Sequence, residues 1–173
     1  AERPFVAMWK DEDELQTVTF GEFLALANRQ AARMTERGVG PGDRVIVIMP
    51  QGISLMTAFA GAMLLGAVPA ILAYPNFKVE PSKYRAGISG VMSNLNARLL
   101  LLDEAFPPEL LDAISSEKGP EILQVSRLCQ APTAELVVRH SARPDDLAFI
   151  QFSAGTTGLQ KGVALSHGAV LRQ

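Results

Sequence analysis

The fold is decided by residues 45–49, Val45-Ile46-Val47-Ile48-Met49, which are apolar at every position. A strand with one face in water alternates apolar and polar side chains, whereas a continuous apolar run is typical of a strand covered by helices on both faces. The turn Gly40-Pro41-Gly42-Asp43 leads into this run, since proline fixes φ and glycine permits positive φ. We therefore expect a strand over 44–49 inside a parallel sheet.

Helix and strand patterns alternate along the rest of the chain. Thr19 and Glu22 have the spacing of a capping box, and apolar residues then recur at helical spacing up to about Gly38. Further helices are expected over 53–65, 82–96 and 107–118, and strands over 68–73, 98–102, 121–125 and 147–152. This alternation predicts an α/β fold with an open, mostly parallel sheet and flanking helices.

Two segments depart from that rhythm. Residues 5–9 and 17–20 flank the acidic run 11–14, which indicates a hairpin with a solvated turn; a catalytic carboxylate cluster is the alternative. Residues 126–146 are richer in polar and turn-forming side chains, with Val137-Val138 as a short edge strand. The chain also stops at Gln173, shortly after a helix begins near Ser166, so we expect it to be a piece of a longer polypeptide.

Composition narrows the class of protein. The 173 residues include 16 basic and 18 acidic side chains, and 48% are apolar, which suffices for one packed core. The near-neutral balance gives no electrostatic reason to expect a nucleic-acid partner, and no stretch reaches the roughly 20 apolar residues of a membrane span. There is no secretory signal pattern at the N-terminus, and the lone Cys129 fits a reducing compartment, so we expect a cytoplasmic protein.

The stretch most informative about chemistry follows the last buried strand. Residues 152–162 read Phe-Ser-Ala-Gly-Thr-Thr-Gly-Leu-Gln-Lys-Gly and combine three glycines, three hydroxyls and one lysine. Glycines let backbone N–H groups converge on one point, hydroxyls add donors, and Lys161 adds a positive charge, so the loop can wrap a polyphosphate. Ligands in open α/β sheets lie beyond the carboxyl ends of strands, where this loop falls. The alternative is a flexible Gly/Thr turn with a solvated lysine.

Other phosphate and nucleophile motifs fit less well. In a Walker A motif the residue before the lysine is glycine and the residue after it is Ser or Thr, but here Gln160 and Gly162 occupy those places. The glycines at 38–42 precede their strand and lack dinucleotide-binding spacing. No Gly-x-Ser-x-Gly elbow occurs, and the two histidines, far apart in sequence, do not indicate a zinc site.

The sequence over 152–162 resembles the phosphate loop of the adenylate-forming superfamily, which includes acyl-CoA synthetases, fatty acyl-AMP ligases, luciferases and peptide-synthetase adenylation domains. Ala154 stands where Ser or Thr is common, and Gln160 replaces the usual proline. Residues 17–22, 38–45 and 61–69 resemble, in order, the family's early strand-to-helix entry, the turn into its first parallel strand and its Gly-Ala-Val-Pro helix exit. The likeness implies that residues 1–173 are the leading subdomain of an AMP-binding domain, ending just after the phosphate loop.

The resemblance also implies an activity. Family members activate a carboxylic acid with ATP and Mg²⁺, release pyrophosphate, and in many cases pass the acyl group to CoA or a carrier thiol such as that of an acyl carrier protein. By motif position, the residues that would hold the β- and γ-phosphates are Ser153, Gly155, Thr156, Thr157, Gly158 and Lys161. Lys161 would be the catalytic cation on the leaving group, and Ser153 would also lie near Mg²⁺.

Some alternatives stay open at this point. His167 invites a catalytic interpretation, but Ser166-His167-Gly168 is more simply a helix start with Ser166 as N-cap. Cys129 has no evident partner base. Residues 68–75 look more like the fatty-acyl-activating branches than the amino-acid-activating ones. There are two alternatives to an enzyme. One is a non-catalytic nucleotide-binding module, and the other is a degenerate family member used as an interaction domain.

Overall fold

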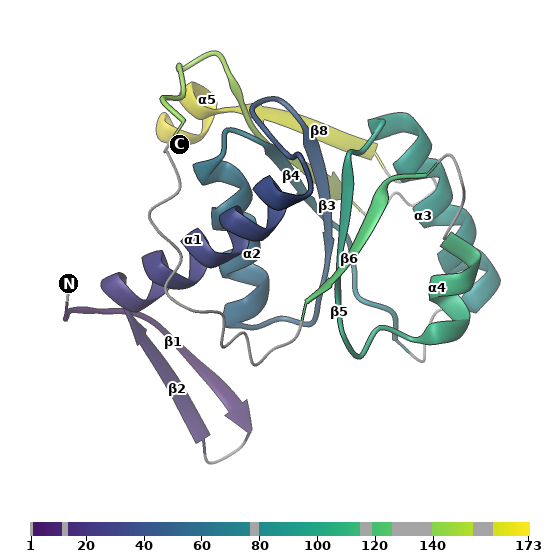
Figure 1. Cartoon of the computed structure of the whole chain (residues 1–173), viewed down its shortest axis with the longest axis horizontal. Helices are drawn as coiled ribbons and strands as arrows, with labels where there is room; N and C mark the ends of the chain where they lie inside the picture. The colour runs from purple at the N-terminus through teal and green to yellow at the C-terminus, as the bar shows by residue number, and fades with distance from the viewer. Residues whose placement is uncertain (1, 12–13, 77–79, 115–118, 126–139, 154–160) are drawn as a thin grey trace.

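A six-stranded sheet with helices on both faces forms the body of the protein, and a two-stranded hairpin projects from it (Figure 1). The computed structural model describes residues 2–11, 14–76, 80–114, 119–125, 140–153 and 161–173. The helices are α1 (Phe20–Glu36), α2 (Ile53–Leu64), α3 (Pro81–Leu95), α4 (Pro108–Ile114) and α5 (His167–Leu171). The strands are β1 (Pro4–Asp11), β2 (Glu14–Thr19), β3 (Arg44–Ile48), β4 (Val68–Ile71), β5 (Leu99–Asp103), β6 (Glu121–Val125), β7 (Leu147–Ser153) and β8 (Lys161–Ser166).

The strand order in the main sheet is β6-β5-β3-β4-β7-β8. Every neighbouring pair from β6 to β7 is parallel, and only β8 runs antiparallel to its neighbour β7. The expected open, mostly parallel α/β sheet is therefore confirmed. Sequence reasoning missed β8, because it treated residues 161–166 as part of the loop before the last helix.

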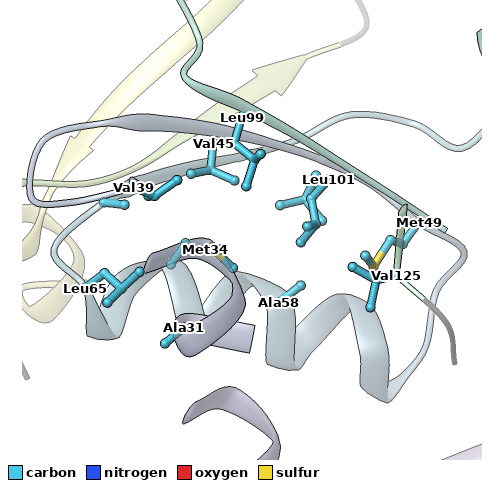
Figure 2. Close-up of a cluster of buried hydrophobic side chains, with 13 residues drawn as sticks. Ala31, Met34, Val39, Val45, Met49, Ala58, Leu65, Leu99, Leu101 and Val125 are labelled. Atoms are coloured by element: carbon cyan, nitrogen blue, oxygen red, sulfur yellow. The ribbon is translucent and has the colours of Figure 1, made fainter. Parts of the chain in front are cut away.

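The apolar run 45–49 is covered on both faces, as expected. Val45 and Val47 pack with Leu99 and Leu101 of β5 in the cluster on the side of α1 and α2. Figure 2 shows Val45, Leu99 and Leu101 above Met34 and Ala58 of these helices. Alternate residues of the same strands, such as Ile46 and Leu100, point to the other face and pack under α3 and α4. Because both faces are buried, every residue of β3 after the exposed Arg44 and every residue of β5 before the buried Asp103 is apolar.

Helices α1 and α2 approach each other closely at Gly61. A Cβ atom at this position would lie 2.7 Å from the carbonyl oxygen of Ala27 and 3.0 Å from the backbone nitrogen of Ala31. Both are backbone atoms, so neither can move aside as a flexible side chain would. By contrast, a Cβ atom on Gly90 of α3 would have no neighbour within 4 Å.

We expect Gly61→Ala to lower the free energy of unfolding by about 1–3 kcal/mol because the helices must separate to admit the methyl group. Gly90→Ala is the matched control, and its better helix propensity should raise that free energy by about 0.5–1 kcal/mol. Urea denaturation of the two variants checks both values. Equal shifts of the same sign would contradict the close approach at Gly61.

The hairpin β1–β2 and the start of α1 agree with the sequence. The Thr19 hydroxyl oxygen accepts a hydrogen bond from the Glu22 backbone N–H at 3.2 Å, and the Glu22 carboxylate accepts one from the Thr19 N–H at 2.8 Å. The capping box is thus confirmed. Residues 12–13 of the acidic run, the tentative strand at 137–138 and Cys129 lie outside the described residues.

The capping box gives Glu22 a pH-dependent role. Hydrogen bonds from the Thr19 backbone and side chain hold the pKa of the Glu22 carboxyl below its ordinary value of 4.5. A lowered pKa means that the charged form stabilises the fold above the ordinary value and that this contribution is lost as the pH falls through the lowered one. We expect Glu22→Gln to be less stable than the wild type at about pH 7, and we expect the difference to shrink in chemical denaturation as the pH falls below the ordinary value of 4.5. A difference that persists at the acid end would contradict this assignment.

Candidate phosphate-binding site

The glycine-rich loop leaves the sheet at the carboxyl end of β7. This strand lies parallel to β4, with Ile150 paired to Ala70, and its inner residues Ala148 and Ile150 are buried. Phe149, on the other face, meets the Phe59 ring of α2 edge-on, with 5.5 Å between ring centroids. The strand before the loop is therefore fixed from both sides, and the loop begins at the sheet edge where ligands bind in folds of this class.

The two ends of the loop lie side by side on the neighbouring strands β7 and β8. Ser153 closes β7 and is paired directly with Lys161, the first residue of β8. Residues 154–160, which include Gly155, Thr156, Thr157 and Gly158, lie outside the described residues. The structure thus brings together two of the six sequence-predicted residues, Ser153 and Lys161, and the other four lie outside the described residues.

Lys161 is available for an anionic ligand. Its side chain is exposed, and no acidic side chain in the described part of the chain pairs with it. Register places Lys161 one step beyond the Phe152–Gly162 pair on the antiparallel ladder. The backbone of Lys161 is therefore fixed in strand β8, and this limits the positions that its ammonium group can reach.

Gly162 is needed for close packing beside the lysine. A Cβ atom on Gly162 would lie 3.0 Å from the ring of Phe152 and 3.1 Å from a methyl carbon of Ile150. Phe152 in turn packs against the buried clusters on the α3 side of the sheet. The aromatic residue at the start of the loop and the glycine at its end therefore form one contact that holds the hairpin together.

A set of polar groups at the same sheet edge was not anticipated from the sequence. Asp103 ends β5 with only 2% of its surface exposed, and its carboxylate accepts a hydrogen bond from Ala105 N–H at 3.0 Å. The Tyr74 hydroxyl donates to the Ala105 carbonyl at 3.0 Å, and the Tyr84 hydroxyl donates to Ala73 at 2.8 Å. Burial, and then the neighbouring Tyr74, raises the pKa of Tyr84 well above its ordinary value. An acid that ends a run of four leucines was the available signal for Asp103.

Two hollows lined by described residues lie at the opposite edge of the sheet. One, of about 770 Å³, lies between α3 and the amino ends of β5 and β6 and includes Arg98 and Glu121. The other, of about 480 Å³, includes Gly42, Gly66 and His140. Neither hollow includes Ser153 or Lys161, so a search for the site by cavity volume would not have selected the loop.

The remaining candidates have structural roles within the described residues. Ser166 caps α5 by accepting a hydrogen bond from Ala169 N–H at 3.2 Å, as expected, and the His167 N–H donates to Asp146. No group of three or more His, Cys, Asp or Glu side chains that could hold a metal occurs in that part of the chain. None of its helices has the length and apolar character to cross a membrane.

Comparison with known proteins identifies the family. The model of the AMP-binding enzyme family matches residues 1–173, and the chain belongs to this family. It is 31% identical to 3-hydroxybenzoate–CoA ligase of an Aromatoleum species over 90% of this chain and 30% of that protein. It is 30% identical to long-chain-fatty-acid–CoA ligase FadD13 of Mycobacterium tuberculosis over 88% of this chain and 30% of that protein.

A solved structure shows the same fold over almost the whole chain. The acyl-CoA synthetase of Brucella canis superposes with a TM-score of 0.77 at 18% identity, covering 98% of this chain and 32% of that one. The expected mostly parallel α/β architecture of an adenylate-forming enzyme is thereby confirmed. The chain spans about 30% of the length of the curated relatives that it matches.

Proposed function

We propose that residues 1–173 are the leading part of an enzyme that activates a carboxylic acid with ATP, forming an acyl-adenylate and releasing pyrophosphate. The observation that carries this proposal is the hairpin β7–β8, in which a Gly/Thr-rich loop leaves the carboxyl end of a parallel strand and returns with Lys161 opposite Ser153. Membership of the AMP-binding enzyme family supports it.

The loop residues would act on the leaving group. When the carboxylate oxygen attacks the α-phosphorus, the bond to the bridging oxygen breaks and negative charge develops on pyrophosphate. That charge would be stabilised by the backbone N–H groups of residues 155–158, by the hydroxyls of Thr156 and Thr157, and by the Lys161 ammonium group. The protein supplies no covalent nucleophile in this scheme.

Mg²⁺ fits this arrangement only as a partner of the phosphates. The described residues contain no acidic cluster for a metal cage, and Mg²⁺ at nucleotide sites is commonly held by few protein groups plus phosphate oxygens. Ser153, at the end of β7, would be the contact from this chain. The ion would neutralise part of the phosphate charge, and Lys161 would neutralise another part.

The acid is a fatty or an aromatic one. Relatives at similar identity are named for 3-hydroxybenzoate and for long-chain fatty acids, and residues 68–75 favour the fatty-acyl branches. CoA is the acceptor that both relatives' names support; a carrier-protein thiol is the other acceptor, and the cytoplasm is the proposed location.

Chemical labelling of Lys161 tests whether this lysine binds the phosphates of ATP. In the enzyme that contains residues 1–173, ATP with Mg²⁺ should slow modification of Lys161 by an amine-reactive reagent. Lys83 is the internal control, because it is exposed on α3 and its ammonium group lies 3.8 Å from the Glu80 carboxylate. Equal labelling of Lys161 with and without ATP, at concentrations that support turnover, would overturn the assignment.

The 173-residue chain alone should show no adenylation. It spans about 30% of the length of its curated relatives, and neither of the two hollows described above includes Ser153 or Lys161. We expect no carboxylate-dependent pyrophosphate release from the purified chain. Its detection would contradict this expectation. ATP protection of Lys161 without turnover in the longer protein would instead favour a nucleotide-binding module.

A further inference from the structure

The position of Lys161 depends on the register of strand β8. This strand is at the edge of the main sheet, and among the described residues it pairs only with β7. Residues that lie opposite each other in an antiparallel pair share a face of the sheet, and a slip by one residue turns every side chain to the other face. The face on which the Lys161 ammonium group lies is therefore set by this one pairing, which puts Lys161 opposite Ser153.

A β-bulge contributes to that register. The pairing shifts between Leu147 and Phe149, where two steps along β7 match one step along β8. If the pairing continued from Leu147 without this shift, Lys161 would lie opposite Phe152, whose ring packs against the cluster under α3 and α4. The bulge places Lys161 opposite Ser153 instead, provided that the end of the hairpin at Leu147 is itself held in place.

A tight turn directly before β7 holds that end of the hairpin, where β8 runs into α5 (Figure 1). The Asp146 carboxylate accepts a hydrogen bond from the Arg143 N–H at 2.7 Å, and the Asp146 N–H donates to the Arg143 carbonyl at 3.1 Å. The carbonyl groups of the same turn accept hydrogen bonds from the first residues of α5. The His167 N–H donates to Asp146 at 3.0 Å, and the Gly168 N–H donates to Pro144 at 2.7 Å.

Two residues control this contact between the turn and the helix. The Asp146 carboxylate shapes the turn, and it also lies 3.9 Å from Nε2 of His140. Gly168 is buried, and a Cβ atom there would lie 3.0 Å from the carbonyl oxygen of Pro144. The neighbouring Asp145 is exposed to solvent, so it offers a comparison with the same side chain.

We propose that Asp146 is a positioning residue for Lys161. Its carboxylate shapes the turn that holds the start of α5, and together with the bulge this fixes the register in which β8 presents Lys161 opposite Ser153. The proposal rests on the proposed function for the role of Lys161 in acid activation. A side chain remote from the reacting atoms affects the rate in this way because a displacement of about 1 Å in a site can cost about 10²-fold.

Substitutions of the two neighbouring aspartates test this in the enzyme that contains residues 1–173. Asp146→Ala should lower the rate of acyl-adenylate formation about tenfold. Asp146→Asn should retain most of the rate, because its amide oxygen can still accept the hydrogen bond from the Arg143 N–H. Asp145→Ala is the matched control and should leave the rate unchanged. Equal losses in Asp146→Ala and Asp146→Asn, or in Asp146→Ala and Asp145→Ala, would overturn the proposal.

A double-mutant cycle separates positioning of Lys161 from a general loss of structure. If Asp146 acts through Lys161, Asp146→Ala should lower the rate by less than about twofold in a Lys161→Ala background. Gly168→Ala is a second variant, because its methyl group would displace the start of α5 from Pro144, and its loss of rate should also depend on Lys161. Gly90→Ala is the control for it. The same loss with and without Lys161 would overturn the proposal.

Amide hydrogen exchange gives a readout that does not depend on activity. In the same enzyme, Asp146→Ala should make the backbone amides of β8 exchange about tenfold faster, whereas Asp146→Asn and Asp145→Ala should leave their rates unchanged. Unchanged amide exchange in Asp146→Ala would contradict the proposal. If the unsubstituted enzyme forms no acyl-adenylate with any acid, the proposed function fails, and the amide rates still decide whether Asp146 fixes the register of β8.

Discussion

Lys161→Ala is expected to lower the rate of acyl-adenylate formation by about 10²–10³-fold in the enzyme that contains this chain, the effect typical of removing one donor from a charge-stabilising site. The lysine begins β8 opposite Ser153, directly after the sequence segment that would hold the leaving pyrophosphate. Its charge matters most when the α-phosphorus–oxygen bond breaks. Affinity for the carboxylic acid should therefore change little while the rate falls.

Single-turnover measurement of acyl-adenylate, with acid binding measured separately, separates these two effects. Lys83→Ala on α3 is the control, because it removes another exposed positive charge. Lys161→Arg should recover part of the rate, since it keeps the charge but changes the shape of the donor. An unchanged rate in Lys161→Ala would remove the lysine from the site.

Leu101→Ala should lower the free energy of unfolding by about 2–5 kcal/mol. Leu101 lies in the middle of β5, is fully buried, and packs with Val45, Met34 and Ala58 between the sheet and the helices (Figure 2). The neighbouring strands β3 and β6 hold its backbone on both sides, so the site cannot collapse to fill the lost volume. Because a domain is stable by only about 5–15 kcal/mol, this one change should remove a large share of the total.

Leu171→Ala is the matched control for that loss. The Leu171 side chain is 86% exposed in this chain, so the same truncation should change the free energy by about 0.5 kcal/mol or less. Urea titration of both variants in the 173-residue chain gives the comparison. A loss below about 1 kcal/mol for Leu101→Ala would mean that the sheet is not packed as described.

The parallel sheet could be predicted from the sequence because its signals are local. The apolar run 45–49, the capping box at Thr19 and the proline and glycine turns each specify one element without reference to the rest of the chain. Alternation of these elements then leaves few topologies, since crossovers between parallel strands are right-handed. The boundaries agree to within about two residues for most elements.

Features that depend on pairing between distant segments were not predictable in this way. Strand β8 begins with lysine and glycine and is a strand only because β7 provides its ladder. The position of β7 beside β4, which places the loop at the edge of the sheet, follows from tertiary packing at Phe59 and Phe149. The link between Asp146 and Lys161 needed the register of β7 and β8 as well as the sequence.

The residue types of the candidate site could be predicted from the sequence, but their arrangement in space could be predicted only in part. Glycines, hydroxyls and a lysine at fixed spacing indicate a phosphate loop because those groups donate hydrogen bonds and charge to oxygen anions. The structure adds the pairing of Ser153 with Lys161 and the contact of Gly162 with Phe152. Asp103 and the two tyrosines at the same edge came from the structure, since their burial and hydrogen bonds leave little trace in the sequence.

The most direct test of acid activation is ATP–pyrophosphate exchange in the enzyme that contains residues 1–173. Fatty acids of several chain lengths and hydroxybenzoates are the acids to screen, each with ATP, Mg²⁺ and labelled pyrophosphate. Label should appear in ATP only when the right acid is present, and Lys161→Ala should reduce that exchange by about 10²-fold or more. Absence of acid-dependent exchange across the screen, in a protein that is folded and binds ATP, would contradict the assignment of this chain to an acid-activating enzyme.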